Sequence, residues 1–179
     1  MIAIGEHCML REVRLSDAEA LFKLGQDAEV MQYYGMEPYT HIEEALDEIA
    51  WFESLERENK GFRWVIVDKA DVYIGNIGVF NFDARHNRVE LGYKLARSYW
   101  GKGIMSQCIQ TVLKQCFEVK YYNRVEAIVD PRNEGSRQVL LKNGFTYEGR
   151  LREYEFEKGQ YIDVDMFSVL QSDYYVMNK

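Results

Sequence analysis

The feature that most constrains this chain is an abrupt change from a strand pattern to a helix pattern across a turn with two glycines. Residues 88–96 alternate apolar and polar side chains and are rich in strand-forming residues, whereas apolar residues recur at helical spacing from Met105 onward. Between them lies Trp100-Gly101-Lys102-Gly103, where the glycines allow backbone angles that other residues avoid. The amides of such a turn, at the positive end of the following helix, suit a phosphate or pyrophosphate.

The turn alone does not identify a ligand, because a G-x-G between a strand and a helix can also be only a tight turn. Two known glycine-rich motifs are excluded. The P-loop needs Gly-Lys followed by Ser or Thr, whereas Ile104 follows Gly103 here. The dinucleotide-binding fingerprint needs a third glycine, and Ser106 stands at that position.

The composition is typical of one domain with a sizeable core. The chain has 179 residues, of which 47% are hydrophobic, and we expect a single domain over residues 1–179. No apolar run approaches ~20 residues and residues 1–14 lack the order of a secretion signal, so we expect a cytoplasmic protein with no membrane partner. Cys8, Cys108 and Cys116 lack metal-ligand spacing, which predicts buried free thiols and no metal site.

The formal net charge of −7 bears on the partner. It disfavours nucleic acid, which binds proteins through its phosphates, and it would attract a cationic or amine substrate. The alternative is that the charge only keeps the protein in solution.

Periodicity and turn residues predict the order strand, helices, three strands, helix, strand, helix and two strands. The expected strands are 8–14, 62–68, 72–82, 88–96, 124–129, 145–156 and 161–169, and the expected helices are 17–24, one starting at residue 40 or 41, 104–118 and 134–142. Ser16, with Glu19, is expected to cap the first helix, and Asn133 the last. This order predicts an α+β fold, a mixed α/β sandwich.

An aromatic loop precedes the long polar helix. It contains Tyr33, Tyr34, Met36 and Tyr39. Together with the helix it could form one wall of a substrate pocket, although each of these residues could instead simply pack on a sheet.

Two separated motifs, read together, resemble the GNAT superfamily of N-acetyltransferases. Residues 91–95 leading into residues 99–103 resemble its coenzyme A pyrophosphate loop, Q/R-x-x-G-x-G/A, and residues 133–145 resemble its N-x-x-S/A…G-F helix. The wording Tyr-Trp-Gly-Lys-Gly, the opening Met-Leu-Arg at residues 9–11 and residues 159–165 are similar to the RimJ/RimL type, which acetylates protein N-terminal amines. The Q/R position holds Ser98 here, with Arg97 one place earlier, so backbone amides are expected to hold the pyrophosphate.

The resemblance implies the GNAT-type acyl-CoA N-acyltransferase fold, a central mostly antiparallel sheet flanked by helices, with acetyl-CoA as cosubstrate. By that analogy two neighbouring strands separate, the amide near Leu95 binds the acetyl oxygen, and residues 98–104 cradle the pyrophosphate. Lys102 could reach a phosphate or remain in solvent. The expected cofactor-binding residues are Leu95, Arg97, Ser98, Trp100, Gly101, Lys102, Gly103, Ile104, Met105, Asn133 and Ser136.

Proton transfer needs a general base and a general acid, and the sequence offers candidates for both. Glu90, two residues before Gly92 on the central strand, is our first choice for the general base, although glutamates are also common on solvent faces of strands. Asp163 and Asp165 are alternatives, and could instead orient a cationic substrate. The family's frequent general acid is a tyrosine on the helix after Asn133, but that position holds Leu140. Ser136 is therefore the candidate acid, or a helix-start hydroxyl that bonds the backbone.

The acceptor class follows from amine ionisation. An α-amino group with a pKa of ~7.7 to 8.0 is partly neutral at pH 7, whereas a polyamine nitrogen near ~10.4 is charged and needs a stronger base. We therefore expect direct attack of a protein or peptide N-terminal α-amine on the thioester. Small-molecule amines (polyamine, aminoglycoside, amino acid), a non-catalytic acyl-CoA-binding module and an ATP-binding protein are the alternatives, and both a monomer and a homodimer are compatible with the sequence.

Overall fold

The computed structural model describes residues 1–6 and 8–178, whose strands form one eight-stranded sheet in the order β1-β2-β3-β4-β5-β6-β8-β7. The strands are β1 (Ile2–Ile4), β2 (Cys8–Arg11), β3 (Phe62–Asp68), β4 (Tyr73–Asp83), β5 (Arg88–Leu95), β6 (Arg124–Val129), β7 (Thr146–Glu157) and β8 (Gln160–Leu170). Every neighbouring pair is antiparallel except β5 and β6, which run parallel. The sheet is therefore mixed, as predicted.

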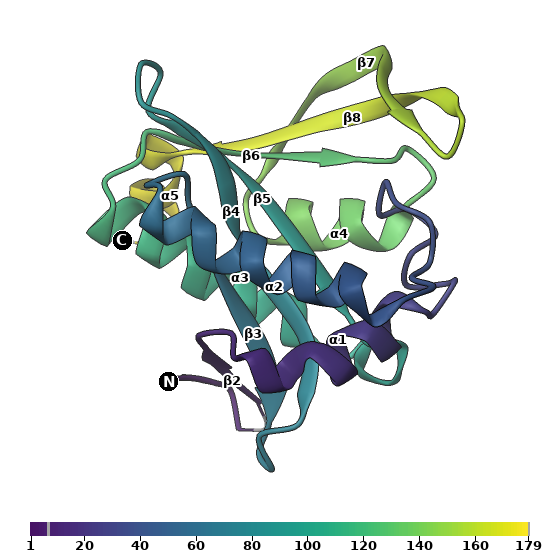
Figure 1. The fold of residues 1–179 in the computed structure, drawn as a ribbon. Helices are drawn as coiled ribbons and strands as arrows, with labels where there is room; N and C mark the ends of the chain where they lie inside the picture. The colour runs from purple at the N-terminus through teal and green to yellow at the C-terminus, as the bar shows by residue number, and fades with distance from the viewer. Residues whose placement is uncertain (7, 179) are drawn as a thin grey trace.

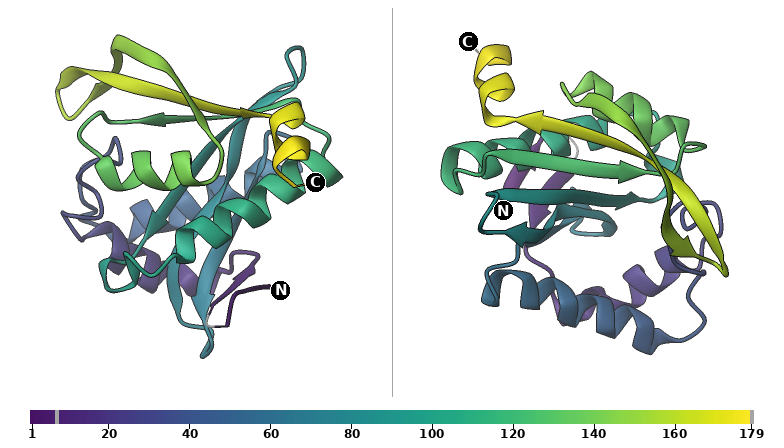
Figure 2. Two further views of the ribbon diagram at one scale, coloured as in Figure 1. Left: turned by 180° about the vertical axis from the view of Figure 1, so that it is seen from behind. Right: turned by 90° about the horizontal axis from the view of Figure 1, so that it is seen from above.

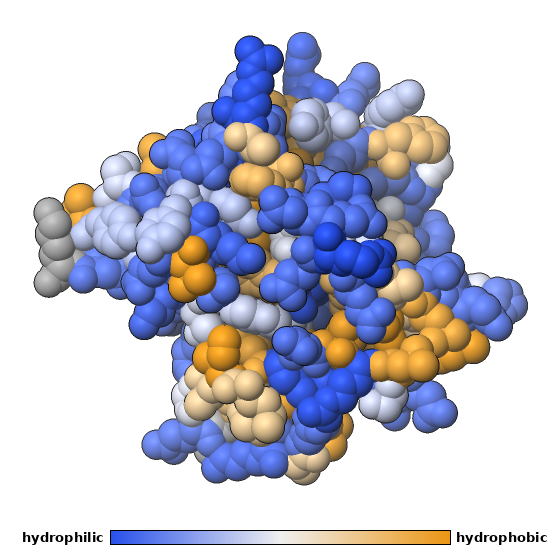
Figure 3. Space-filling model, turned by 60° about the vertical axis from the view of Figure 1, so that its left-hand side comes forward, coloured by the Kyte–Doolittle hydropathy of each residue, from blue (hydrophilic) through white to orange (hydrophobic). Residues whose placement is uncertain are grey.

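Helices cover both faces of the sheet. They are α1 (Ala18–Gly25), α2 (Ile42–Arg57), α3 (Ile104–Lys114), α4 (Glu134–Lys142) and α5 (Gln171–Met177). Helices α1 and α2 lie on one face, and α3 and α4 lie on the other (Figures 1 and 2). Among the described residues no helix is long and apolar enough to cross a membrane. In the view of Figure 3 polar residues cover most of the surface and apolar residues form separate patches.

The sheet has an apolar core on each side because alternate side chains of a strand point to opposite faces. On the α1/α2 face, Val65 and Val67 pack with Leu21, Ile49 and Phe52. The other face carries the larger cluster, whose members include Ile66, Leu91, Ile109, Phe117 and Leu140. Helix α3 continues into a π-helical turn (Gln115–Val119), so the expected helix of residues 104–118 is confirmed in extent.

Strands β5 and β6 separate along their length. They are in register only from Arg88 to Glu90, although β5 stays paired with β4 as far as Leu95. The Ala96 amide donates to the Ile74 carbonyl at 2.8 Å, and hydrogen-bonding groups alternate sides along an antiparallel strand. The amides of Tyr93 and Leu95 therefore face the gap that opens toward β6.

The structure differs from the predicted elements near the chain's start. The strand predicted for residues 8–14 ends at Arg11, three residues early, and the Arg11 side chain forms a buried ion pair with Asp17 at 2.8 Å. Asp17, and not Ser16, receives the Arg14 amide at 2.8 Å, so the predicted Ser16 cap is wrong. Strand β1 and helix α5 were not predicted, since three and seven residues are too short for a clear periodic pattern.

Candidate active site

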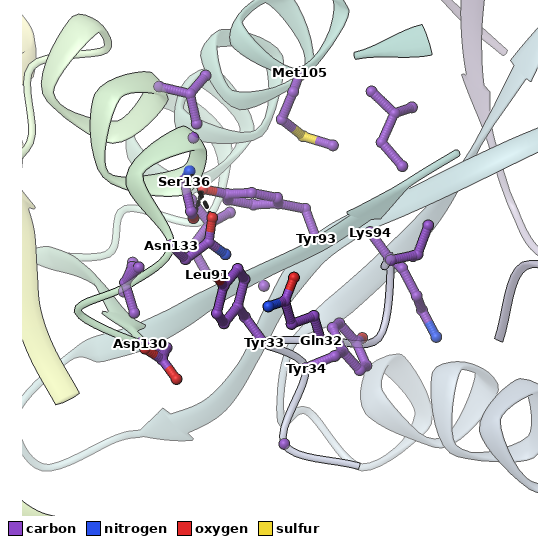
Figure 4. Close-up of a pocket in the computed structure, with 18 of the residues that line it drawn as sticks. Gln32, Tyr33, Tyr34, Leu91, Tyr93, Lys94, Met105, Asp130, Asn133 and Ser136 are labelled. Atoms are coloured by element: carbon purple, nitrogen blue, oxygen red, sulfur yellow. Dashed lines mark hydrogen bonds between the residues drawn. The ribbon is translucent and has the colours of Figure 1, made fainter. Parts of the chain in front are cut away.

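A cleft of about 1300 Å³ follows the gap between β5 and β6. One end is lined by the glycine turn and the first turns of α3 and α4, and the other by residues 32–36 and helix α2. Figure 4 shows the middle of this cleft, where Tyr93 and Lys94 leave β5 in opposite directions. The cleft thus passes through the sheet from the α3/α4 face to the α1/α2 face.

The glycine turn has the backbone conformation that its sequence predicted. Gly101 and Gly103 have φ angles of +71° and +76°, and a Cβ atom added to either would meet no atom within 4 Å. The glycines are therefore required for backbone angle rather than for space. Gly103 precedes α3 without a side-chain cap, which leaves the first amides of the helix available to an anion. The Trp100 indole donates to the Leu95 carbonyl at 2.7 Å and ties the turn to the end of β5.

We expect Gly103→Ala to weaken coenzyme A binding by about 10-fold, because a non-glycine residue in the left-handed region is strained by about 1–2 kcal/mol and the turn must change shape to relieve it. Isothermal titration calorimetry measures this. Gly159→Ala is the matched control, because Gly159 has a φ of +79°, an equally open environment and no place in the cleft. Equal affinities of the two variants would contradict a role of the turn in binding.

The structure separates the predicted cofactor-binding residues into two groups. Those that line the cleft are Leu95, Trp100, Gly101, Gly103, Ile104, Met105, Asn133 and Ser136. The side chains of the other three lie elsewhere. Arg97 bonds Asp27 at 2.8 Å and Glu29 at 2.6 Å, and Lys102 lies 5.2 Å from the centre of the Tyr99 ring beside a smaller cavity of about 270 Å³. Ser98 is exposed, and like Arg97 and Lys102 it is not part of the cleft lining.

Ser136 lies in the first turn of α4 and meets a residue that the sequence argument missed. The Asn133 side chain caps the helix by accepting the Ser136 amide at 3.1 Å, as predicted. The Ser136 hydroxyl oxygen is 2.5 Å from the Tyr93 hydroxyl oxygen (Figure 4). Burial raises the pKa of Tyr93, so its hydroxyl stays protonated. The sequence pattern that could have revealed the orientation of Tyr93 is the strand alternation, which places its side chain on the same face as those of Leu91 and Leu95.

Glu90 lies on the opposite face of β5 and lines the cleft, an orientation that the sequence left open. Its carboxylate accepts the Asn81 side-chain amide at 3.1 Å. Burial raises the pKa of Glu90, and the Glu126 carboxylate adds to this, while the Asn81 bond opposes it. A carboxylate with a raised pKa in a cleft is a reasonable general base.

The two alternative carboxylates are outside the cleft lining. Asp165 is buried and paired with Arg150 at 2.9 Å and Arg137 at 3.1 Å. Asp163 accepts the Glu153 amide at 2.9 Å, within the β7–β8 hairpin. Both carboxylates thus support the hairpin, and the structure does not bring them to Glu90.

The α1/α2 end of the cleft has an aromatic wall. Of the two alternatives for the aromatic loop, a pocket wall or simple packing on the sheet, the structure therefore shows the pocket wall. Tyr33, Tyr34, Met36, Tyr39 and Trp51 line it. Beneath them Lys94 forms a buried ion pair with Glu48, with nitrogen to oxygen distances of 3.0 and 2.9 Å, and Tyr39 donates to the same carboxylate. This polar group was not anticipated, because its members are far apart in the sequence.

Acidic side chains surround the aromatic wall. Glu44, Asp47, Glu155 and Glu157 all line this end of the cleft. Burial raises the pKa of Glu157 to about 7, and its hydrogen bond with Glu155 contributes. In the part of the chain that the structure describes, no group of three or more His, Cys, Asp or Glu side chains is arranged to hold a metal.

Comparison with known proteins gives a consistent assignment. The Acetyltransferase (GNAT) domain family matches residues 7–146. An uncharacterised N-acetyltransferase of Bacillus licheniformis is 38% identical over 170 residues, which are 94% of this chain and 96% of that protein.

Two solved structures share this fold. A spermidine N-acetyltransferase from Vibrio cholerae, in complex with CoA and spermine, has a TM-score of 0.80 at 26% identity and covers 94% of this chain and 98% of its own. A ribosomal-protein-S5-alanine acetyltransferase from Vibrio fischeri has a TM-score of 0.79 at 26% identity, with 97% and 98% covered. The fold, the cleft and the sequence matches agree, and the chain belongs to the GNAT family of acetyltransferases.

Proposed function

We propose that this enzyme transfers the acetyl group of acetyl-CoA, its cosubstrate, to the α-amine of a protein or peptide N-terminus, as a single cytoplasmic domain over residues 1–179. The observation that carries the proposal is the position of Glu90 and the Tyr93–Ser136 pair on opposite faces of β5 at the same gap. One face thus offers a proton acceptor for the amine, and the other offers a proton donor for the thiol.

The edge of β5 and the glycine turn are suited to hold the cosubstrate. The amides of Tyr93 and Leu95 point into the gap without a strand partner, so they can bond an extended, amide-containing arm as a neighbouring strand would. The Leu95 amide would stabilise the charge on the acetyl oxygen, an effect worth about 3 kcal/mol for one placed donor. Backbone amides of residues 98–104 would bind the pyrophosphate.

Proton transfer completes the reaction. Glu90 takes a proton from the attacking amine, directly or through water, as the new carbon–nitrogen bond forms. The carbon–sulphur bond then breaks, and the Ser136 hydroxyl, held in place by its hydrogen bond with Tyr93, gives the leaving thiolate a proton. Solvent returns a proton to Ser136, and Glu90 releases to solvent the proton that it took. A thiol with a reference pKa of ~8.5 is a fair leaving group, so this weak acid is sufficient.

The acceptor class is the part of the proposal that the relatives leave open, since one named structure is a spermidine enzyme and another a ribosomal-protein enzyme. We favour the α-amine, because a single carboxylate base suits an amine that is partly neutral at pH 7. The acidic rim of the cleft favours a polyamine or another cationic small molecule as the second candidate.

An amine panel tests the proposal. Thiol release from acetyl-CoA is measured with an N-terminal peptide, the same peptide with a blocked N-terminus, spermidine and an aminoglycoside. We expect the highest kcat/KM with the free peptide. Faster turnover of spermidine would reverse the order of the two candidates, and coenzyme A binding without turnover of any amine would favour a non-catalytic module.

We expect Ser136→Ala to lower kcat by about 10-fold or more, because the thiolate then leaves without a proton donor. Tyr93→Phe removes only the second hydroxyl of the pair, so its loss should be smaller. Steady-state kinetics with acetyl-CoA and the peptide measure both. Thr111→Ala, a hydroxyl deletion on the exposed face of α3, is the control and should keep the wild-type kcat. A Ser136→Ala variant as active as this control would contradict the assigned role.

A further inference from the structure

Besides Lys94, a second cationic side chain reaches the α1/α2 end of the cleft, where we expect the acceptor amine to bind. It comes from a distant strand. Arg63 of β3 is in register with Gly78 of β4, which is in register with Gly92 of β5. Because neither glycine has a side chain, the Arg63 side chain can extend across β4 to β5. A Cβ atom added to Gly92 would lie 3.1 Å from the Arg63 Nη1 atom. The row of glycines therefore places the guanidinium beside the cleft, which both Arg63 and Gly92 line.

Three of the guanidinium's hydrogen bonds are made and one nitrogen is left over. The Nε and Nη2 atoms donate to the Asn76 side-chain oxygen at 3.0 and 2.7 Å, and Nη2 also donates to the Tyr34 hydroxyl at 3.1 Å. Nη1 is buried without a partner, the one such side-chain atom found among residues 1–6 and 8–178. Arg63 as a whole is 5% exposed.

An unpaired buried donor on a charged group is unfavourable and calls for an explanation. The Trp51 and Phe52 rings lie 5.8 and 5.3 Å from the guanidinium carbon, which is favourable for a cation. A ring face does not satisfy an in-plane N–H donor as an oxygen lone pair does. The half-buried Phe80 ring is the other neighbour at Gly92, 2.9 Å from the same added Cβ position.

We propose that Nη1 of Arg63 binds an oxygen of the acceptor substrate, the carbonyl or carboxylate next to the reacting amine. This inference rests on the proposed function. Glu90 is two residues from Gly92 on the same face of β5, so a base for the amine and a donor for the oxygen stand side by side. An α-amino acyl group carries both partners on adjacent carbons. A polyamine carries only donors and a like charge, so it leaves Nη1 unpaired.

The first test uses the wild-type enzyme and two amines of the same shape. Alaninamide carries the oxygen, and 2-amino-3-methylbutane replaces its amide with methyl groups. The kcat/KM values are compared per neutral amine at several pH values. We expect alaninamide to be favoured by about 10- to 100-fold, the value of one hydrogen bond from a charged donor. Free alanine, as a third arm, distinguishes a carboxylate from a peptide carbonyl.

The second test uses variants that act on Nη1 in different ways. Arg63→Lys removes it together with the bonds to Asn76 and Tyr34. Gly92→Ala keeps the arginine but places a methyl group 3.1 Å from Nη1, and the Phe80 ring must move to make room for it. Both should reduce the alaninamide preference to about threefold or less. Arg57→Lys, an exposed arginine on α2, is the matched control and should keep the wild-type ratio.

The outcomes separate this inference from the proposed function. Turnover of both amines at equal rates by the wild-type enzyme would overturn the role of Arg63 and leave the acetyltransferase reading intact. Turnover of neither alaninamide nor the peptide, with spermidine acetylated, would overturn both the α-amine proposal and this inference. Should Arg63→Lys fail to fold, an unchanged preference in Gly92→Ala would overturn the inference by itself.

Discussion

Glu90→Gln is expected to lower kcat by about 10²- to 10⁴-fold, the usual contribution of a positioned general base. The amide has the shape of the carboxylate and can still bond Asn81, but it cannot take a proton from the amine. Coenzyme A affinity should change little, because Glu90 lies on the face of β5 opposite the Tyr93–Ser136 pair. Steady-state kinetics and calorimetry on the same preparation measure both. A variant with the wild-type kcat would exclude Glu90 as the base.

The pH profile provides an independent check. A base must be deprotonated to act, so kcat should rise with pH through a pKa above the ordinary value of 4.5, because burial and the Glu126 charge raise the pKa of Glu90. This limb should be absent from Glu90→Gln. Glu126→Gln is the matched control: Glu126 does not line the cleft, and removal of its charge should move the limb to lower pH while the maximal kcat is kept. A limb that stays in place in this control would contradict the electrostatic explanation.

The parts of the fold that could be predicted from sequence are those encoded by neighbouring residues. The β3-β4-β5 meander has strong apolar–polar alternation, and the Asn133 cap of α4 bonds an amide only three residues away. The bounds of these strands and of α4 were therefore predicted within one or two residues. The glycine turn was also accessible, because a left-handed φ at Gly101 and Gly103 is a property of those residues themselves. For the same reason the turn that we propose as the pyrophosphate site could be located before any contact was known.

Contacts that depend on strand register could not be predicted. Tyr93 and Ser136 are 43 residues apart, and their hydrogen bond requires the start of α4 to reach across the gap beside β5. Ser136 was identified by motif, while Tyr93 was read only as part of a strand. Arg63 was likewise read only as a strand residue, since its position at the cleft depends on glycines in two other strands. Spacing within one segment carries no information about such pairs.

Lys94→Met is expected to lower the free energy of unfolding by about 3–5 kcal/mol, the usual effect of removing one partner of a buried ion pair. The side chains of Lys94 and Glu48 are 0% and 8% exposed, so the Glu48 charge would remain largely buried, with the Tyr39 hydroxyl as its one other side-chain donor among the described residues. Lys94 also lies 4.3 Å from the centre of the Tyr34 ring, a favourable contact that the variant loses. Urea denaturation at pH 7 measures the change.

The exposed pair Lys60–Glu58 offers a matched control, because its 2.6 Å distance is as short but its side chains are 62% and 42% exposed. Lys60→Met should cost about 0–1 kcal/mol, since water solvates the remaining carboxylate. The double variant Lys94→Met/Glu48→Gln should recover much of the loss, because glutamine removes the unpaired charge and still accepts the Tyr39 hydroxyl. Equal losses in the buried and exposed single variants, or no recovery in the double variant, would mean that packing rather than buried charge determines the stability of this wall of the cleft.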